Sequence, residues 1–550
     1  MGRRGRSKSL GAVRAVFGNF ELRRVELAYV LYVTAKYGTR VAILVFAYER
    51  GGAAATGLAA VIQLLPAAII APMASVLGDR IRRERALLAG YAAQAVAVAG
   101  TAAAMLAGAP AAVVYALTAL VAGSVTLTRP VQSALLPQLA RSPDELIAAN
   151  VVAGSIYGAM TLVGPAAAGV LLVFGGSALA LAAFAGLLVV ATLLVVGLEP
   201  HPPSVRHGGP LHEAAAGFRA VAREPHQRLV VGLLVGQSVV AGMQDVLLVV
   251  IALGLFGLPP SAAGFLAAAR GVGGLLGGLW GLGLVGKARL AAAMAFGQLV
   301  YGFGAAGLAF AVVTAALAAF LVVAGSGYAR ADIAGRTLLQ RVVPDRVVAR
   351  VFGVLEGVNQ LGLAAGAALA PVLVAVLGIR VGTLVAGLLL PTAVLVLRGR
   401  IRALDRAISI PERELAILGS VDLFAPLPAQ ALEGIASRVK RVAVTPNAVI
   451  MRKGDIGDRF YVVGDGEVEV ARDGRPIATL GPGEYFGEIA LLRDVPRTAT
   501  VTAKTPATFL ALDRADFLEA VTGHPVVREA ADVTIRKRMP RDEGHAPSRG

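Results

Sequence analysis

The sequence predicts a multi-domain protein in which an all-α, polytopic membrane part of two six-helix halves precedes a soluble part of short antiparallel strands. Three observations predict this fold class. The 550 residues are 56% hydrophobic and only 16% charged, which is too apolar for a soluble protein. Apolar runs of about 20 residues, the length that a bilayer core requires, recur from residue 25 to residue 397. Beyond residue 420, apolar and polar residues alternate instead.

Twelve apolar runs are predicted to span the lipid bilayer, and a longer polar segment separates the first six from the last six. The predicted spans are residues 25–48, 56–78, 86–107, 111–129, 147–173, 177–197, 229–254, 261–285, 288–308, 311–329, 347–376 and 379–397. The predicted domains are a basic N-terminus (1–24), an N-half (25–197), a central loop (198–228), a C-half (229–397), a connector (398–420), a soluble domain (421–538) and a polar tail (539–550).

Basic residues gather in alternate loops, and this pattern predicts the orientation. They follow spans 2, 8 and 10 and fill the central loop, whereas the other loops hold almost nothing basic beyond Arg50 and Arg380. Because Lys and Arg favour the cytoplasmic side, we expect a multi-pass protein of the plasma membrane with both termini and the soluble domain in the cytoplasm. These loops account for the net charge of +17, so it does not indicate nucleic acid binding.

Several classes of site are excluded by composition and spacing. The chain has no cysteine, so disulfides, thiol catalysis and thiolate metal sites are excluded. No histidine lies in a predicted span, and the four histidines of the central loop are irregularly spaced in a linker that contains Pro and Gly, so we expect no metal site. No nucleophile, base and orienting group occur together, so the sequence predicts neither catalytic residues nor an enzyme.

Charged and amide side chains inside the predicted spans are the candidate transport residues, because a charge in the bilayer core is costly unless it is paired or hydrated. Lys36 and Arg40 lie four residues apart, on one helix face. The other candidates are Gln244, Asp245, Arg270, Glu356 and Asn359. We expect them to line a central cavity in which Asp245 or Glu356 accepts a coupling proton. The alternative is that Asp245 and Arg270 form a structural pair while Lys36 and Arg40 anchor a gate.

The two sets of six spans resemble the major facilitator superfamily, and two motifs strengthen the resemblance. Residues 77–85 read Leu-Gly-Asp-Arg-Ile-Arg-Arg-Glu-Arg, which is similar to the superfamily's Gly-x-x-x-Asp-Arg-x-Gly-Arg-Arg loop, with Arg82 in place of its glycine. The resemblance implies that Asp79 and Arg80 form a conformational latch at the cytoplasmic face. Span 5 resembles the glycine-proline motif of superfamily antiporters, which predicts close helix packing and a kink at its proline. Its motif residues are Gly154, Gly158, Gly164, Pro165 and Gly169.

Shorter motifs resemble the branch of the superfamily that holds macrolide-efflux and siderophore-export proteins. They are Arg129-Pro130 with Leu136-Pro137, Ala148-Ala-Asn150, Gln340-Arg-Val-Val-Pro344 and Arg350-Val-Phe352. The resemblance implies a secondary active transporter that exports an amphipathic small molecule in exchange for protons. An ion channel does not fit, because the chain has no selectivity-filter loop and no arginine-rich sensor helix.

The most specific pattern in the chain runs from Phe486 to Val501 and reads Phe-Gly-Glu-Ile-Ala-Leu-Leu-Arg-Asp-Val-Pro-Arg-Thr-Ala-Thr-Val. The small residues Gly487 and Ala490 leave backbone N–H groups open to an anion. Arg497 can hold two oxygens of one phosphate, and Glu488 can accept a hydrogen bond from a ribose hydroxyl. The pattern therefore predicts a cyclic, phosphorylated ligand.

This stretch resembles the phosphate-binding cassette of cyclic nucleotide-binding domains, which occur in catabolite activator proteins, protein kinase regulatory subunits and cyclic nucleotide-gated channels. Predicted strands at 460–463, 467–470 and 476–480 resemble that family's β-roll with its flanking helices, with Asn447 where glycine is usual and a hairpin turn at Asp473-Gly474. The implied binding residues are Phe486, Gly487, Glu488, Ile489, Ala490, Arg497, Thr498 and, on a lid helix at 525–539, Thr534.

The identity of the nucleotide stays open at this point. A hydroxyl at Thr498 suits cyclic GMP, but many bacterial family members with the same Arg-Thr pair bind cyclic AMP, which we favour weakly. A β-roll that folds without ligand is the alternative. No DNA-reading element and no other cofactor is expected. The sequence thus predicts a transporter regulated by cyclic nucleotide, and the alternative function is a membrane-anchored cyclic-nucleotide receptor that no longer transports.

Overall fold

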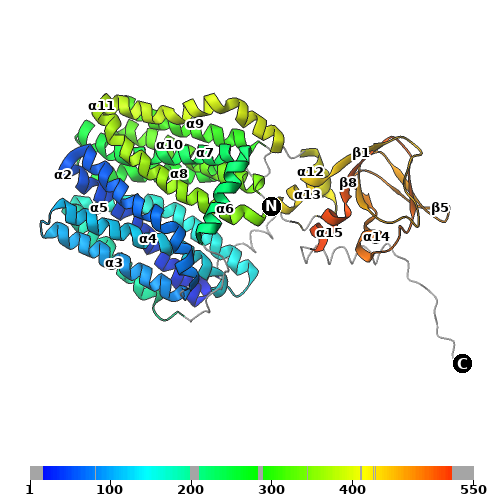
Figure 1. Ribbon diagram of the computed structural model, residues 1–550, viewed down its shortest axis with the longest axis horizontal. Coiled ribbons are helices and arrows are strands. Elements are labelled where there is room, and N and C mark those ends of the chain that lie inside the picture. The colour runs from blue at the N-terminus through cyan, green and yellow to red at the C-terminus, as the bar shows by residue number, and fades with distance from the viewer. Residues whose placement is uncertain are drawn as a thin grey trace. The chain divides into compact units, whose positions relative to one another are not determined.

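The computed structural model describes residues 16–80, 82–198, 210–282, 289–343, 345–408, 412–424, 427 and 429–522. The chain divides into two compact units, Met1–Ala407 and Ile408–Gly550. In Figure 1 the first unit contains the long helices drawn from blue to yellow, and the second contains the strands together with short helices.

The first unit is helical throughout its described elements, and its long helices lie side by side (Figure 1). Among the described residues, eight helices are long and apolar enough to cross a membrane, and Ala111–Val125 is a shorter apolar helix. The elements are α2 (Phe20–Arg80), α3 (Arg83–Leu106), α4 (Ala111–Leu139), α5 (Pro143–Val195), α6 (Pro210–Arg223), α7 (Pro225–Val249), the π-helix η1 (Val250–Leu255), α8 (Ser261–Leu282), α9 (Leu290–Gly307), the 3-10 turn η2 (Leu308–Phe310), α10 (Thr314–Val342) and α11 (Asp345–Ile408).

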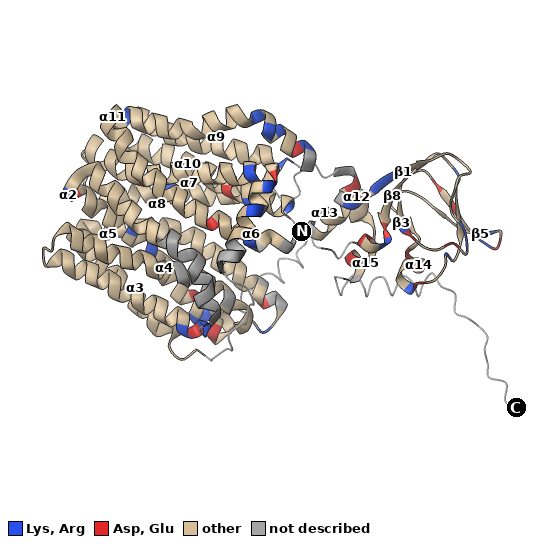
Figure 2. Cartoon of the chain, in the orientation of Figure 1, with Lys and Arg blue, Asp and Glu red and all other residues tan. Residues whose placement is uncertain are grey.

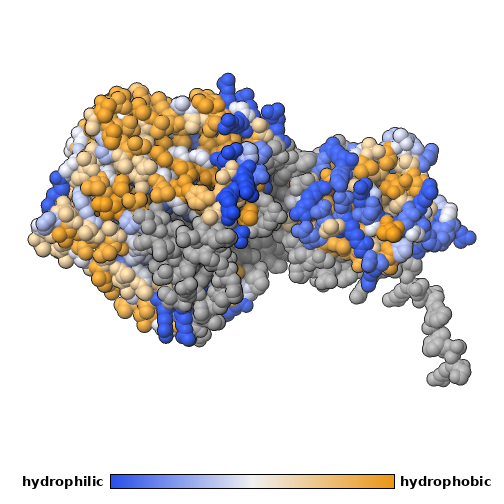
Figure 3. Space-filling model, in the orientation of Figure 1, coloured by the Kyte–Doolittle hydropathy of each residue, from blue (hydrophilic) through white to orange (hydrophobic). Residues whose placement is uncertain are grey.

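The surface of this unit separates apolar from charged residues. Apolar side chains cover most of the described helical surface on the face shown in Figure 3. Lys and Arg gather where α6 lies and where α11 ends (Figure 2). An apolar belt with charge at one end is the pattern that a bilayer and its cytoplasmic interface favour. Within the predicted central loop, Pro210–Arg223 forms the helix α6.

Glycines interrupt three of the long helices. The backbone leaves helical geometry at Gly51 and Gly52 in α2, at Gly175 and Gly176 in α5, and at Gly378 in α11. Gly52, Gly176 and Gly378 have φ of 59°, 66° and 77°, a conformation in which a Cβ would be strained. These breaks coincide with the predicted boundaries between spans 1 and 2, 5 and 6, and 11 and 12.

Some glycines of the glycine-proline motif in α5 pack closely against neighbouring helices, and others have open space around them. A Cβ at Gly164 would lie 2.8 Å from a carbonyl of α2, and one at Gly169 would lie 3.1 Å from the carbonyl of the first residue of α8, so the predicted close packing is confirmed there. The prediction is wrong for Gly154, which has open space around it, and for Gly158, whose nearest neighbour is at ordinary distance. Pro165 lies within helical backbone, and the break in α5 comes later, at Gly175 and Gly176.

The second unit contains two four-stranded antiparallel sheets, with strand orders β1-β8-β3-β6 and β2-β7-β4-β5. Alternate residues of β3 face opposite sides: Phe460 and Val462 pack with the short helices, whereas Tyr461 and Val463 pack between the sheets. The elements are α12 (Glu412–Ser420), α13 (Ala429–Arg438), β1 (Lys440–Val444), β2 (Val449–Met451), β3 (Arg459–Asp465), β4 (Val468–Arg472), β5 (Arg475–Leu480), β6 (Tyr485–Phe486), α14 (Glu488–Arg493), β7 (Thr500–Ala503), β8 (Ala507–Asp513) and α15 (Arg514–Thr522).

The turns of this unit follow the sequence closely. Asp473 and Gly474 have φ of 51° and 80° and connect β4 to β5, so the predicted hairpin is confirmed. Asn447 has φ of 64°, which Asn tolerates better than most residues. The lid helix predicted at 525–539, with Thr534, lies outside the described residues.

Candidate functional site: a charged cavity and a phosphate cassette

A cavity of 1940 Å³ opens in the helical unit. Its lining comes from α2, α3, α4 and α5, from Phe218 of α6, and from α7, α8, α9, α10 and α11, so both predicted halves contribute. The structure places all seven candidate transport residues on this lining: Lys36, Arg40, Gln244, Asp245, Arg270, Glu356 and Asn359.

Asp245 is bonded by two arginines from different helices. Arg40 of α2 donates through Nη2 to Asp245 Oδ2 at 2.5 Å, and Arg270 of α8 donates through Nη1 to Asp245 Oδ1 at 2.7 Å. The Asp245 side chain on α7 is only 8% exposed. The predicted Asp245–Arg270 pair is therefore part of a triad with Arg40 that joins α2 to α7 and α8.

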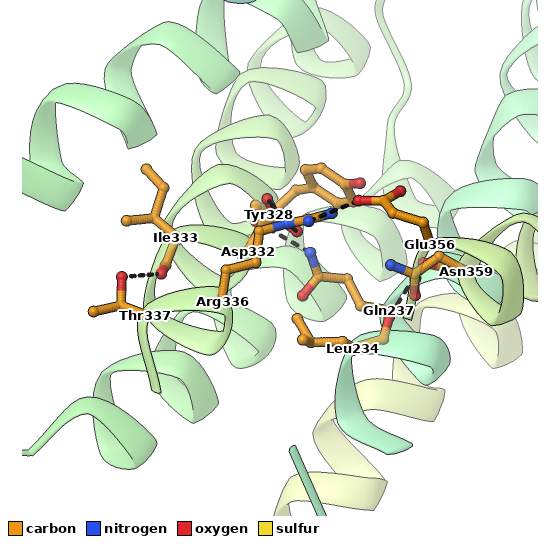
Figure 4. A network of polar contacts seen from close by, with 10 residues as sticks. Leu234, Gln237, Tyr328, Asp332, Ile333, Arg336, Thr337, Glu356 and Asn359 are labelled. Atoms are coloured by element: carbon orange, nitrogen blue, oxygen red, sulfur yellow. Dashed lines mark hydrogen bonds and ion pairs between the residues drawn. The ribbon is translucent and has the colours of Figure 1, made fainter. Parts of the chain in front are cut away.

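A second ionic cluster has the opposite composition. Arg336 of α10 donates through Nε to both carboxylate oxygens of Asp332 at 3.0 Å and through Nη1 to Glu356 Oε1 of α11 at 2.8 Å (Figure 4). Sequence reasoning missed Asp332 and Arg336, because α10 continues to Val342, beyond the predicted end of its span at residue 329. Their spacing of four residues, which favours an ion pair along a helix, was the available signal.

Amide side chains lie on the cavity wall, at Gln244 and Asn359, and next to it, at Gln237. Asn359 accepts a hydrogen bond from the hydroxyl of Ser238 at 3.1 Å, and Gln237 donates to the carbonyl of Tyr328 at 3.2 Å (Figure 4). Gln244 is buried, and neither its amide nitrogen nor its amide oxygen has a hydrogen-bond partner within the described part of the chain. Unpaired buried amides are costly, so Gln244 is available to a substrate or to water.

The predicted latch residues cannot be placed. The backbone of Asp79 and Arg80 forms the end of α2, but their side chains lie outside the described residues.

In the second unit, Arg497 is the centre of the predicted cassette. Its guanidinium is buried and donates to the carbonyls of Gly487 at 3.0 Å and of Arg459 at 2.7 Å, with Asp458 Oδ1 at 3.4 Å. Its backbone is fixed as well, because Arg497 N donates to the carbonyl of Asp455 at 2.8 Å. The turn before β3 therefore positions the arginine beside the glycine that opens the cassette.

The backbone conformation and surroundings of Gly487 leave no room for a side chain. It has φ of 90°, and a Cβ there would lie 2.7 Å from Arg497 Nη1. Gly457 is similarly constrained, because a Cβ there would lie 3.0 Å from the Cβ of Ala490. Burial raises the pKa of the Tyr461 hydroxyl, and the neighbouring carboxylate of Asp458 raises it further, so this phenol stays neutral at physiological pH.

The other cassette residues differ in their surroundings. Glu488 is 3% exposed, whereas Ile489 and Thr498 are partly exposed. The ring of Phe486, a predicted binding residue, stacks on Tyr461 at 5.2 Å between centroids and packs edge-on to Phe509. Phe486 belongs to the core between the sheets, because β6 pairs with β3 at this point.

Comparison with known families covers both units. Residues 25–252 match the family model described as Major Facilitator Superfamily, and residues 441–524 match the one described as Cyclic nucleotide-binding domain.

Among curated proteins, the chain is 36% identical over 135 residues to a cyclic nucleotide-gated potassium channel of Rhizobium etli, covering 24% of this chain and 37% of that protein. It is 36% identical over 103 residues to a cAMP-dependent protein kinase regulatory subunit of Schizosaccharomyces pombe, covering 18% and 25%. These matches therefore span well under half the length of the relatives.

Among solved structures, a catabolite activator protein of Thermus thermophilus is 32% identical, with a TM-score of 0.20, over 21% of this chain and 57% of that one. The family matches show that the chain carries a Major Facilitator Superfamily domain at residues 25–252 and a C-terminal cyclic nucleotide-binding domain at residues 441–524.

Proposed function

We propose that this protein is a secondary active transporter of the plasma membrane that exports an amphipathic small molecule in exchange for protons, under the control of a cytoplasmic cyclic nucleotide. The observation that carries the proposal is the cavity of 1940 Å³, in which the triad of Arg40, Asp245 and Arg270 connects helices of both predicted halves. Twelve spans follow if the three glycine breaks divide α2, α5 and α11 into two spans each. Drug or siderophore exporters are the branch that the short motifs favour.

The two ionic clusters suit different tasks, and Glu356 is the better proton acceptor. Protonating Asp245 would break ion pairs with two arginines. Glu356 and Asp332 instead share a single arginine, so one added proton leaves that cluster neutral. Glu356 is also 52% exposed, which gives it access to water in the cavity.

Cyclic nucleotide is the proposed regulatory ligand, with its phosphate at Arg497 and its ribose at Glu488. The arginine is held beside Gly487 by backbone carbonyls, so it is oriented before ligand arrives. Such preorganisation lowers the cost of ordering on binding. Cyclic AMP is favoured over cyclic GMP on the sequence pattern alone.

A short covalent path links the two units. Helix α11 ends at Ile408 in the second unit and α12 begins at Glu412. Before that end, Asp405 accepts hydrogen bonds from the backbone N–H groups of Ala291 at 2.8 Å and Ala292 at 2.9 Å, at the start of α9. We propose that nucleotide binding moves the end of α11 and, through Asp405, shifts the equilibrium between inward- and outward-facing states.

Reconstituted liposomes test the proposal. An imposed proton gradient is expected to drive export of a lipophilic dye by the wild type, and cyclic AMP is expected to change the rate. Glu356→Gln should abolish gradient-driven flux while nucleotide binding persists, and Arg380→Gln, outside the described cavity lining, should leave flux intact. Nucleotide binding without any flux in the wild type would instead support the membrane-anchored receptor.

A further inference from the structure

The charged groups of the cavity are unequal in number. Among the described lining residues, five are cationic (Lys36, Arg40, Arg270, Arg336 and Arg350) and three are anionic (Asp245, Asp332 and Glu356). The cavity therefore carries two positive charges in excess. A net positive, partly water-excluded cavity attracts anions and opposes cations, because opposite charges interact more strongly where water is scarce.

One cationic site on this lining is the triad of Arg40, Asp245 and Arg270. In the Arg40–Asp245–Arg270 triad two guanidiniums share one carboxylate, which leaves a net charge of +1. The carboxylate is 8% exposed, whereas the Arg40 and Arg270 side chains are 26% and 31% exposed. The triad thus presents its cationic side to the cavity and keeps its anionic side buried.

The two arginines also retain hydrogen-bonding capacity. Each guanidinium has five N–H donors, and in each the bonds to Asp245 in the described structure use a single nitrogen. Guanidinium donors form a planar fork that matches a carboxylate or phosphate better than a lysine does. Asp245 fixes the position of both forks without occupying all of their donors.

Next to the triad, the cavity lining includes glycines and aromatic rings, which offer apolar surface to a ligand. Gly271, Gly274 and Gly278 follow Arg270 on the cavity side of α8, and Gly154 of α5 lies in open space. Tyr157 lines the same cavity, with its hydroxyl 2.8 Å from that of Tyr37. A ligand with a flat apolar body and one anionic group would satisfy both surfaces.

We propose that Arg40 and Arg270 form an anion subsite for the oxyanion group, carboxylate or phosphate, of an amphipathic substrate, and that Asp245 is the positioning residue that orients them. This inference rests on the proposed transport function and narrows its substrate class to amphipathic anions. It excludes lipophilic cations as the preferred cargo.

The test compares two probes with the same rings and different charge, 2-naphthoate and 2-naphthamide. Calorimetry uses the full chain in nanodiscs on an Arg497→Ala background, so that the nucleotide cassette does not contribute. We expect 2-naphthoate to bind at least about tenfold more tightly than 2-naphthamide, the scale of one charge-assisted hydrogen bond. Arg40→Gln and Arg270→Gln should each remove this preference, because Asp245 then neutralises the remaining arginine.

Two controls separate this effect from misfolding. Arg380→Gln makes the same change at an arginine that bonds the carbonyl of Ala309 at 2.8 Å, away from the described lining, and should keep the preference. Arg270→Lys preserves charge but not the fork and should keep part of it. Naphthyl phosphate, added as a third probe, distinguishes a phosphate cargo from a carboxylate.

Equal affinities for the two naphthyl probes, no binding of either, or a preference that survives both Gln variants would overturn the anion subsite. If gradient-driven dye flux persists in that case, the proposed transport function stands alone. If the preference is found but no flux occurs, the subsite stands and the transport function fails.

Discussion

Replacing Asp405 tests how the two units communicate. Its carboxylate accepts hydrogen bonds from the backbone N–H groups of Ala291 and Ala292 at 2.8 and 2.9 Å, so it caps α9 from the C-terminal part of α11. Loss of such a cap costs about 1 kcal/mol, and loss of a negative charge at a helix N-terminus costs roughly 0.3–1 kcal/mol more. Asp405→Ala should therefore weaken the connection by about 1–2 kcal/mol, a factor of roughly 5–30 in a two-state equilibrium.

The assay measures dye flux in proteoliposomes with and without cyclic AMP, alongside calorimetry of nucleotide binding. We expect Asp405→Ala to bind nucleotide as tightly as the wild type, while the ratio of flux with and without nucleotide falls toward one. Asp405→Asn, which keeps an acceptor but loses the charge, should lie between. Arg402→Ala, an exposed change one turn earlier on α11, is the control. A full nucleotide response in Asp405→Ala would refute this route of coupling.

The remaining predictions concern the cassette and the cavity. Arg497→Lys should weaken cyclic AMP binding by about 10²-fold, because a bidentate pair worth roughly 3 kcal/mol becomes a point contact, and unchanged calorimetric affinity would disprove the phosphate assignment. Gly487→Ala should lower the thermal unfolding midpoint. A Cβ at φ of 90° costs roughly 1–2 kcal/mol, and here it would lie 2.7 Å from Arg497 Nη1. An unshifted midpoint would contradict this reasoning. Glu356→Gln should abolish the pH dependence of flux, whereas Asp245→Asn should leave some flux that still depends on pH. The reverse result would indicate that Asp245 accepts the coupling proton. Exchange of one inward proton for one outward monovalent anion moves two charges across the membrane. An inside-negative potential should therefore increase the flux, because it adds about 2.3 kcal/mol of driving force per charge per 100 mV. A flux that does not change with voltage would exclude this stoichiometry.

Local features of this chain could be predicted from sequence because they depend on neighbouring residues. The breaks at Gly51-Gly52, Gly175-Gly176 and Gly378 coincide with predicted span boundaries, since glycine adopts positive φ without strain. The turns at Asn447 and Asp473-Gly474 were predictable for the same kind of reason. The residues of the cassette predicted a phosphate ligand, because the guanidinium of an arginine next to small residues is suited to binding an anion.

Packing decided what each charged residue does. Arg40 and Asp245 are 205 positions apart, and no periodicity relates them; only the packing of α2 against α7 and α8 brings two arginines to one carboxylate. The sequence offered both Asp245 and Glu356 as proton acceptors, and packing places Asp245 against two arginines and Glu356 against one.

The sequence by itself determined that apolar spans enclose a few charged residues, that a phosphate cassette follows them and where the chain turns, because these properties are set by residues close together along the chain. Only the tertiary structure decided that Phe486 belongs to the core, that Asp332 and Arg336 line the cavity and that Asp405 caps α9. Those roles depend on contacts between helices and strands that are distant in sequence, and such contacts exist only once the apolar surfaces have packed.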